Sequence, residues 1–255
     1  MTTHTHDHSA RCWWNSDLAE WVCAAATGPR PAAMEPDRPL VDVRDMIVVH
    51  TALLREFRLA PAAVARVGLG STRQAAAVDR HLRFLCDMLH HHHAGEDELL
   101  WPKLRDRLPD SALRAIDDVE AQHAGIDAAL AEVSAARARW VDGASATSRD
   151  ELAARLGRLH ALLKEHLDLE ESAVLPLAAS VLTDAEWSAI GDAAAAAMPR
   201  STLLLAFGMF AYEGDPAVLK AMLDSAPAVP RLLVPRIAPR VYARRATQVH
   251  GTARP

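Results

Sequence analysis

Apolar residues recur with helical periodicity in four long segments of the chain. From Asp42 onward they repeat about every 3.6 residues, a spacing that places them on one face of an α-helix. The predicted helices span residues 42–67, 72–108, 111–141 and 149–180. Because the breaks between them are short, consecutive helices are expected to run antiparallel. The pattern therefore predicts an all-α fold, an antiparallel up-and-down four-helix bundle with additional C-terminal helices.

The helical pattern also predicts how the chain is divided. The parts are a largely irregular N-terminal extension (1–41), the bundle (42–182), a C-terminal helical appendage (183–227) and a Pro/Arg-rich tail (228–255). The extension carries His4, His6 and His8, which we interpret as part of a solvated terminus without a binding role. The tail lacks acidic residues, and we expect it to lie over the acidic surface of the bundle.

Composition narrows the class of protein. Half of the residues are apolar and only 5% are aromatic, which favours helix over sheet. The net charge of -5 implies no general attraction to nucleic acid or to an anionic membrane. Three cysteines form no disulfide framework, and the longest apolar run, 203–212, is too short to cross a bilayer. We expect a cytoplasmic protein without nucleic-acid or membrane partners; the sequence predicts no particular protein partner.

The two predicted hairpins repeat one arrangement of histidines. The first histidine of each hairpin precedes the second by 42 residues in one case and 43 in the other. The second histidine is followed by a glutamate after four residues and by a proline after ten. These residues are His50, His92, Glu96 and Pro102 in the first hairpin, and His123, His166, Glu170 and Pro176 in the second. Such a match predicts a shared function for both hairpins.

The polar residues of this repeat project onto the apolar faces of their helices. His50 lies among apolar residues such as Ile47 and Leu54. In the second helix Glu96 is central, with His92 and His93 on either side, so the projection alone does not choose between the two histidines. The repeat favours His92, which leaves His93 as a flanking candidate.

Burying ionised carboxylates among apolar residues is costly unless they are paired or bind a metal. A histidine and a glutamate four residues apart lie one helical turn apart, so they can bind adjacent ions, and two such pairs on facing helices define a dinuclear site. Imidazole with carboxylate suits iron, although zinc or manganese could use the same ligands. The predicted metal ligands are His50, His92, Glu96, His123, His166 and Glu170. For any one of these residues alone, a satisfied core histidine or a surface acid is the favoured interpretation, and the repeat argues against it.

These motifs resemble the hemerythrin-like (HHE cation-binding) family. The match rests on His50, the string HHAGEDELLWP from His92 to Pro102, His123, and HLDLEESAVLP from His166 to Pro176. It covers about residues 42–180. The resemblance implies two non-haem iron ions bridged by carboxylate or oxo groups.

Two ligand positions depart from the oxygen-carrying members of that family. Asp127 stands where the carriers have a second histidine on the third helix, and it is expected to face inward beside His123. The carboxylate of the fourth helix is Glu170 by the apolar pattern, whereas the carriers have it at the position of Glu171. Further candidates for metal binding or for orienting a ligand are Asp127, His93, Glu120 and Glu171.

The expected function is that of a metal-binding protein rather than an enzyme, and no catalytic residue is predicted. The small partner would be oxygen, nitric oxide or peroxide, in a sensing, redox or iron-handling role. A di-iron enzyme acting on peroxide or oxygen is the first alternative, with Glu120, Asp97 and His160 as acid or base candidates. A metal-free helical interaction module is the second.

Overall fold

The computed structural model describes residues 12–15, 20–23, 39–224 and 226–255. Near the N-terminus, strands β1 (Cys12–Asn15) and β2 (Glu20–Cys23) pair antiparallel. These two short strands fall within the extension that the sequence predicts to be largely irregular, and their tryptophan and valine residues suit a strand. His4, His6 and His8 lie outside the described residues.

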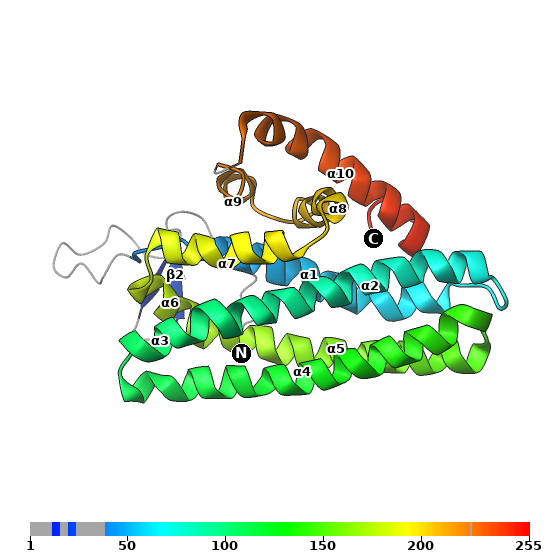
Figure 1. The fold of residues 1–255 in the computed structure, drawn as a ribbon, viewed down its shortest axis with the longest axis horizontal. Helices are drawn as coiled ribbons and strands as arrows, with labels where there is room; N and C mark the ends of the chain where they lie inside the picture. Colours follow the sequence, from blue (N-terminus) through cyan, green and yellow to red (C-terminus); the bar gives the residue numbers. More distant parts are fainter. Residues whose placement is uncertain (1–11, 16–19, 24–38, 225) are drawn as a thin grey trace.

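Four long helices, α1, α2, α4 and α5, lie side by side along the length of the molecule (Figure 1). The first hairpin consists of α1 (Arg44–Ala65), α2 (Thr72–Gly95), a π-helical turn η1 (Glu96–Leu100) and α3 (Trp101–Arg107). The second consists of α4 (Asp110–Gly143), α5 (Ala146–Leu169), a π-helical turn η2 (Glu170–Val174) and α6 (Leu175–Val181). The predicted helical character of this region is confirmed.

The apolar faces of these helices form two separate clusters of buried side chains. One contains Leu53, Leu85 and Leu156 and fills the part of the helices near the α1–α2 connection. The other contains Leu100, Trp101 and Leu175 and lies around η1, η2 and the short helices that follow them. Each fully buried leucine contributes about 1.5–3 kcal/mol through the hydrophobic effect. The buried histidines and glutamates of the site described in the next section lie where these two clusters meet.

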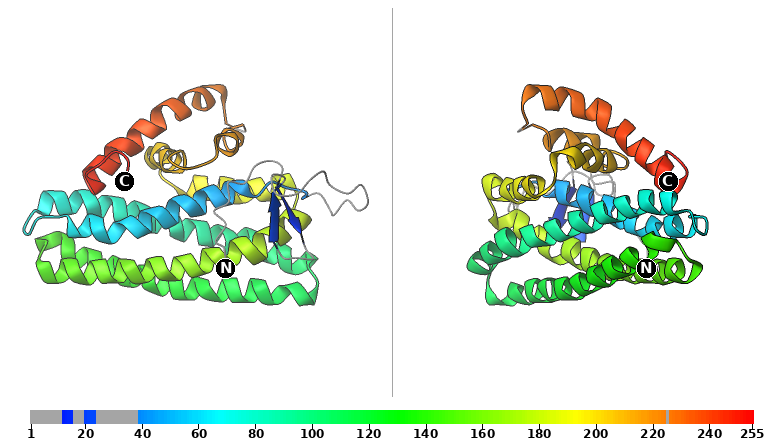
Figure 2. Two further views of the ribbon diagram at one scale, coloured as in Figure 1. Left: turned by 180° about the vertical axis from the view of Figure 1, so that it is seen from behind. Right: turned by 45° about the vertical axis from the view of Figure 1, so that its right-hand side comes forward.

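The C-terminal part of the chain adds four helices on one side of the long ones (Figure 2). They are α7 (Asp184–Ala197), α8 (Arg200–Phe210), α9 (Pro216–Ala221) and α10 (Ala228–His250). Helices α8, α9 and α10 contact α1, and α7 and α10 contact α2. Trp187 of α7 donates a hydrogen bond from Nε1 to Asp45 Oδ1 of α1 at 2.9 Å, which fixes α7 against the first hairpin.

The segment predicted as a Pro/Arg-rich tail is mostly helical. Helix α10 continues through Pro235 and Pro239, although proline removes a backbone donor and usually kinks or breaks a helix. Packing against α8 compensates for this loss, and Gly208 allows the close approach. A Cβ atom at Gly208 would lie 2.1 Å from the carbonyl oxygen of Ala238 in α10.

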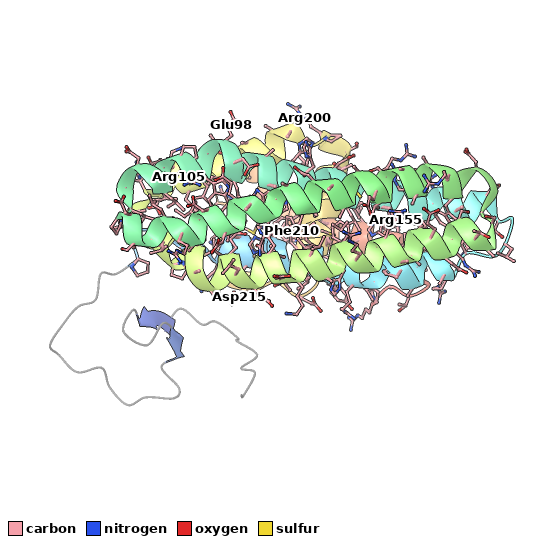
Figure 3. All side chains as sticks on the ribbon, turned by 90° about the horizontal axis from the view of Figure 1, so that it is seen from below. Glu98, Arg105, Arg155, Arg200, Phe210 and Asp215 are labelled. Carbon is pink, nitrogen blue, oxygen red and sulfur yellow. The ribbon has the colours of Figure 1, made fainter. Side chains whose placement is uncertain are left out.

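Charged side chains cover the outer surface of the long helices, including the labelled Arg105 and Arg155 (Figure 3). Arg155 donates to Glu132 of the neighbouring helix α4 at 2.7 Å. Exposed pairs of this kind contribute little stability, about 0–1 kcal/mol each. Within the described ranges, no helix combines the length and the apolar character needed to span a membrane.

Candidate metal centre

Seven histidine and glutamate side chains meet in the interior between the two hairpins. All are buried, with at most 7% of their surface exposed. We call them the central cluster: His50 of α1, His92 and His93 of α2, Glu96 of η1, His123 of α4, His166 of α5 and Glu170 of η2. Each hairpin therefore contributes histidines from its two long helices and one glutamate from its π-helical turn.

Both glutamates occupy the first position of a π-helical turn. The backbone N–H of Trp101 donates to the carbonyl oxygen of Glu96, five residues earlier, and Leu175 donates to Glu170 in the same way. In each hairpin the next residue is a proline, which has no N–H to continue the α-helical pattern. Local insertions of this kind are frequent at functional sites. The sequence thus places a backbone irregularity directly at each glutamate.

The first group of donors consists of His50, His92, Glu96 and Glu170. His92 Nε2 lies 3.1 Å from His50 Nε2 and 3.2 Å from Glu96 Oε1. Glu170 Oε2 lies 3.6 Å from His50 Nε2. One ligand atom from each residue lies within 4.8 Å of the others. Four donor atoms this close together can surround one ion.

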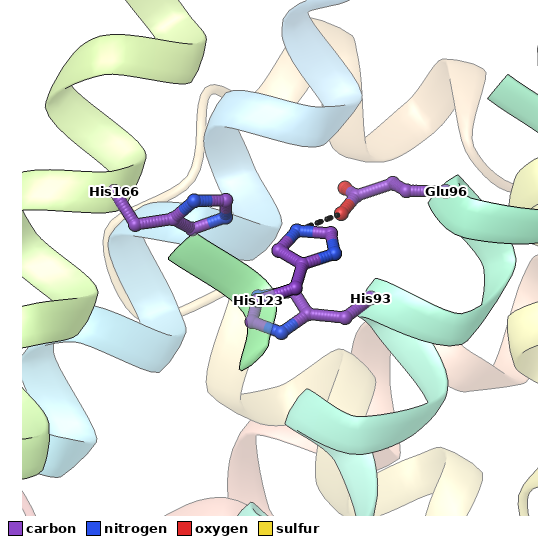
Figure 4. Close-up of side chains that lie close together, drawn as sticks. All are labelled: His93, Glu96, His123 and His166. Carbon is purple, nitrogen blue, oxygen red and sulfur yellow. Dashed lines mark ion pairs between the residues drawn. The ribbon is translucent and has the colours of Figure 1, made fainter. Parts of the chain in front are cut away.

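The second group consists of His93, Glu96, His123 and His166, whose side chains point toward one another from three helices and η1 (Figure 4). The rings of His93 and His123 are stacked with centroids 4.1 Å apart, and His166 lies edge-on to both. Glu96 Oε2 is 3.5 Å from His123 Nε2. This group can surround a second ion.

Glu96 belongs to both groups, which makes the central cluster one site with two compartments. Its Oε1 faces His92 and its Oε2 faces His123. Glu170 is also intermediate, because its Oε2 lies 3.6 Å from both His50 Nε2 and His166 Nε2. A carboxylate with one oxygen toward each compartment has the geometry of a ligand that bridges two metal ions.

Many polar atoms of the central cluster are buried without a hydrogen-bond partner among the described residues. They are both ring nitrogens of His93, Nε2 of His123 and His166, and both carboxylate oxygens of Glu96 and Glu170. Leaving one buried polar group unsatisfied costs about 1–3 kcal/mol, and a charged group costs more. A metal ion satisfies several of these atoms together, so the donors present fit a metal.

Three histidines are oriented by hydrogen bonds on the side of the ring away from the cluster. His50 Nδ1 donates to Glu171 Oε1 at 2.9 Å, and His123 Nδ1 donates to Asp97 Oδ1 at 2.8 Å. His166 Nδ1 lies 3.3 Å from Gln122 Oε1. Because a carboxylate accepts, the proton of a neutral imidazole then sits on Nδ1. The Nε2 lone pair is left free to bind a metal.

Without a metal, burial drives four side chains of the central cluster, Glu96, Glu170, His92 and His93, toward their neutral forms. Burial and the neighbouring Glu170 raise the pKa of Glu96 well above its ordinary value, and burial raises the pKa of Glu170 to about 7. Burial and the surrounding imidazoles hold the pKa of His92 and His93 well below the ordinary value. Neutral imidazoles are the form that binds metal, and a cation favours ionised carboxylates at these positions.

The donor set is rich in imidazole and carboxylate and contains no thiolate. Such a set suits iron, zinc or manganese, whereas calcium and magnesium prefer all-oxygen sites. Cys86 is a free, buried thiol in the neighbouring apolar cluster and takes no part in either group.

The structure brings together the six residues predicted as metal ligands; whether they bind a metal stays a prediction. His93, predicted as a flanking candidate, lies in the second group alongside them. Glu171 contacts His50 rather than lying in either group.

One expectation is wrong. Asp127 was expected to face inward, but it is exposed, since it lies on the outer side of α4 beyond the turn that carries His123. Glu120, also a candidate, is exposed and pairs with Arg105.

Sequence reasoning missed the orienting role of Asp97. Its Oδ1 accepts from both His123 Nδ1 and Trp101 Nε1, the latter at 2.9 Å. The sequence does contain a signal for this orienting role, because an acidic residue directly follows each repeated glutamate: Asp97 follows Glu96, and Glu171 follows Glu170.

The comparison with known families agrees with this geometry. The family described as Hemerythrin HHE cation binding domain matches residues 41–178, more than half of the chain. Among curated proteins and among solved structures, no significant match was found.

Proposed function

Because the chain belongs to the hemerythrin family of HHE cation-binding domains, we propose that its central cluster holds two non-haem iron ions and binds a small diatomic molecule or peroxide. In this proposal α1, α2, α4 and α5 form an antiparallel up-and-down four-helix bundle around the ions. The supporting observation is that Glu96 belongs to both groups of buried donors.

In this proposal the two ions have different numbers of histidine ligands. His50 and His92 would hold one ion, and His93, His123 and His166 the other, with the two glutamates between them. Two such ions supply one-electron redox chemistry and open coordination positions. Each group contains four donor residues, but the compartment with two histidines has fewer imidazole donors, and it is the one proposed to accept the small ligand. Glu171 and Asp97 keep the Nδ1 protons in place on His50 and His123.

The direct test is anaerobic purification of the full chain, followed by iron analysis and an optical spectrum before and after exposure to air. The expected result is about two iron ions per chain and a new absorption band on adding oxygen. Glu120→Gln is a matched control, since Glu120 lies at the surface and pairs with Arg105. Absence of bound iron in the wild-type chain, with no change in the spectrum, contradicts the proposal.

A di-iron enzyme acting on peroxide is the second candidate, favoured by Asp97. This half-exposed carboxylate contacts His123 Nδ1 and could exchange a proton with solvent. Catalytic turnover of peroxide that disappears in Glu96→Ala would support an enzyme, and a single stoichiometric reaction would argue against one. A metal-free interaction module is disfavoured by the unpartnered buried atoms of the central cluster.

A further inference from the structure

A second set of buried histidine and carboxylate groups lies outside the central cluster. It consists of Glu56 of α1, His81 of α2 and His250, the last residue of α10. We call it the C-terminal cluster. One ligand atom from each residue lies within 4.8 Å of the others, and all three side chains are buried. The three residues come from three helices, and His250 follows Glu56 by 194 positions.

The two oxygens of Glu56 have different surroundings. Oε1 accepts hydrogen bonds from the Arg55 guanidinium, with Nη2 at 3.1 Å and Nε at 3.3 Å, and from the Tyr242 hydroxyl. Oε2 faces the imidazoles, with His81 Nε2 at 2.9 Å and His250 Nε2 at 3.2 Å. Arg55 and Tyr242 therefore fix the carboxylate and leave Oε2 directed at two ring nitrogens.

Hydrogen bonding alone does not account well for this arrangement. An ionised carboxylate offers about four lone-pair positions, and the contacts above present five donors if both imidazoles carry Nε2 protons. In addition, the Nδ1 atom of His81 is buried without a partner among the described residues.

Two separations between ligand atoms of this cluster match the spacing around one metal ion. Bonds of about 2.0–2.2 Å from nitrogen and oxygen to a tetrahedral or octahedral ion place neighbouring ligand atoms roughly 2.9–3.5 Å apart. The separations from Glu56 Oε2 to the two Nε2 atoms, 2.9 and 3.2 Å, lie in this range. Two imidazoles and one carboxylate are the protein ligands of many zinc and non-haem iron(II) sites.

We propose that Glu56, His81 and His250 form a separate mononuclear site for a divalent transition-metal ion such as zinc. The ion is bound by Glu56 Oε2 and the two Nε2 atoms, while Arg55 and Tyr242 remain on Oε1. It joins the end of α10 to α1 and α2, and so fastens the C-terminal helices to the long helices. This site does not depend on the identity of the metal or ligand in the central cluster.

Cobalt(II) is a suitable probe, because its visible absorption reports coordination by nitrogen and oxygen ligands. The metal-free full chain is titrated with cobalt(II), and bound ions are counted for the wild type, His250→Ala, His81→Gln and Tyr242→Phe. Binding of a ligand to the folded state alone raises its stability. The expected result is one ion fewer per chain in both histidine variants, and a smaller rise in melting temperature on adding metal.

Tyr242→Phe is the matched control, since it removes a hydrogen bond to Glu56 Oε1 but no proposed ligand atom. It is expected to bind as many ions as the wild type. A His123→Ala variant separates the two sites, because it weakens the central cluster and leaves the absorption of the C-terminal cluster intact.

An equal ion count in the wild type and in both folded histidine variants overturns the proposal. The C-terminal cluster would then be a hydrogen-bonded contact without a metal. Circular dichroism establishes folding, and if His250→Ala fails to fold, the count for His81→Gln decides alone.

Discussion

The two hairpins follow one plan but differ at one buried position that bears on metal binding. In the first, His93 stands between the repeated His92 and Glu96; in the second, the corresponding residue is Leu167, which is equally buried. Leu167 packs in the apolar cluster, whereas His93 joins the second group of donors. One substitution in a repeated motif therefore gives the two compartments different numbers of histidines. A duplicated scaffold can in this way offer two unequal metal positions.

The hairpins also orient each other's histidines. Asp97 of the first hairpin accepts from His123 of the second, and Glu171 of the second accepts from His50 of the first. Each acid directly follows the glutamate of its own π-helical turn. The supporting hydrogen bonds therefore run in both directions between the hairpins, whereas the two compartments contain different numbers of histidines.

The largest effect is expected at the shared glutamate. Glu96→Ala removes the one residue that belongs to both groups, and metal analysis should find that the bound iron falls from about two ions per chain to nearly none. Glu98→Gln is the control, since Glu98 is exposed one half-turn away. If Glu96→Ala kept a full complement of iron, the two compartments would not depend on a shared carboxylate.

The difference between the hairpins at His93 can be removed with His93→Leu, because the second hairpin has a leucine at the corresponding position. The second compartment loses one of its three imidazoles, so we expect about one tightly bound ion per chain to remain. His91→Leu is the matched control, because His91 is adjacent and belongs to neither group. Equal iron contents of the two variants would show that His93 is not a ligand.

The raised pKa of Glu170 in the second hairpin can be tested by measuring the stability of the metal-free chain as a function of pH. Burial raises the pKa of Glu170 from 4.5 to about 7, so between these values the folded chain keeps a proton that the unfolded chain has released. Stability is therefore lost as pH rises through this window, by about 3 kcal/mol or less for this group.

Glu170→Gln removes this loss, so the metal-free variant should resist urea better than the wild type at about pH 8 and show little advantage at about pH 4. Glu165→Gln, at an exposed position on α5 just before η2, serves as the control. A pH-independent difference between Glu170→Gln and the wild type would contradict this account.

The smallest effects are expected from the orienting acids. Asp97→Ala and Glu171→Ala should each weaken metal binding about 10–100-fold in competition with a chelator, the usual cost of removing a partner of a metal-bound histidine. Asp97→Asn and Glu171→Gln keep an accepting oxygen and should recover most of the affinity. If the amide variants were as weak as the alanine variants, the carboxylate charge would matter rather than the orientation of the ring.

The sequence was sufficient to predict the long helices and six residues of the central cluster. Both depend on periodicity, which places apolar residues and the inward histidines on the same face of a helix. The choice between His92 and His93 was not decided by periodicity, because both flank Glu96 on the helix surface. The structure places both histidines in the central cluster, one in each group of donors.

Features that depend on contacts between distant parts of the chain were not predicted. Helix α10 contains interior prolines, and its packing on α8 depends on the absence of a side chain at Gly208. The inward placement expected for Asp127 was wrong because helical projection becomes imprecise at the edge of an apolar face. The C-terminal cluster joins residues from both ends of the helical region, and no local pattern indicates it.

The sharing of donors between hairpins also affects how fast a bound ion can leave. Each compartment includes residues from both hairpins: His50 and Glu170 in one, His93 and His166 in the other. Fraying of a single helix end would therefore release neither ion. Escape requires the hairpins to separate along their common interface, an opening whose free energy approaches that of global unfolding. The residence time of the metal should accordingly follow the unfolding rate of the protein.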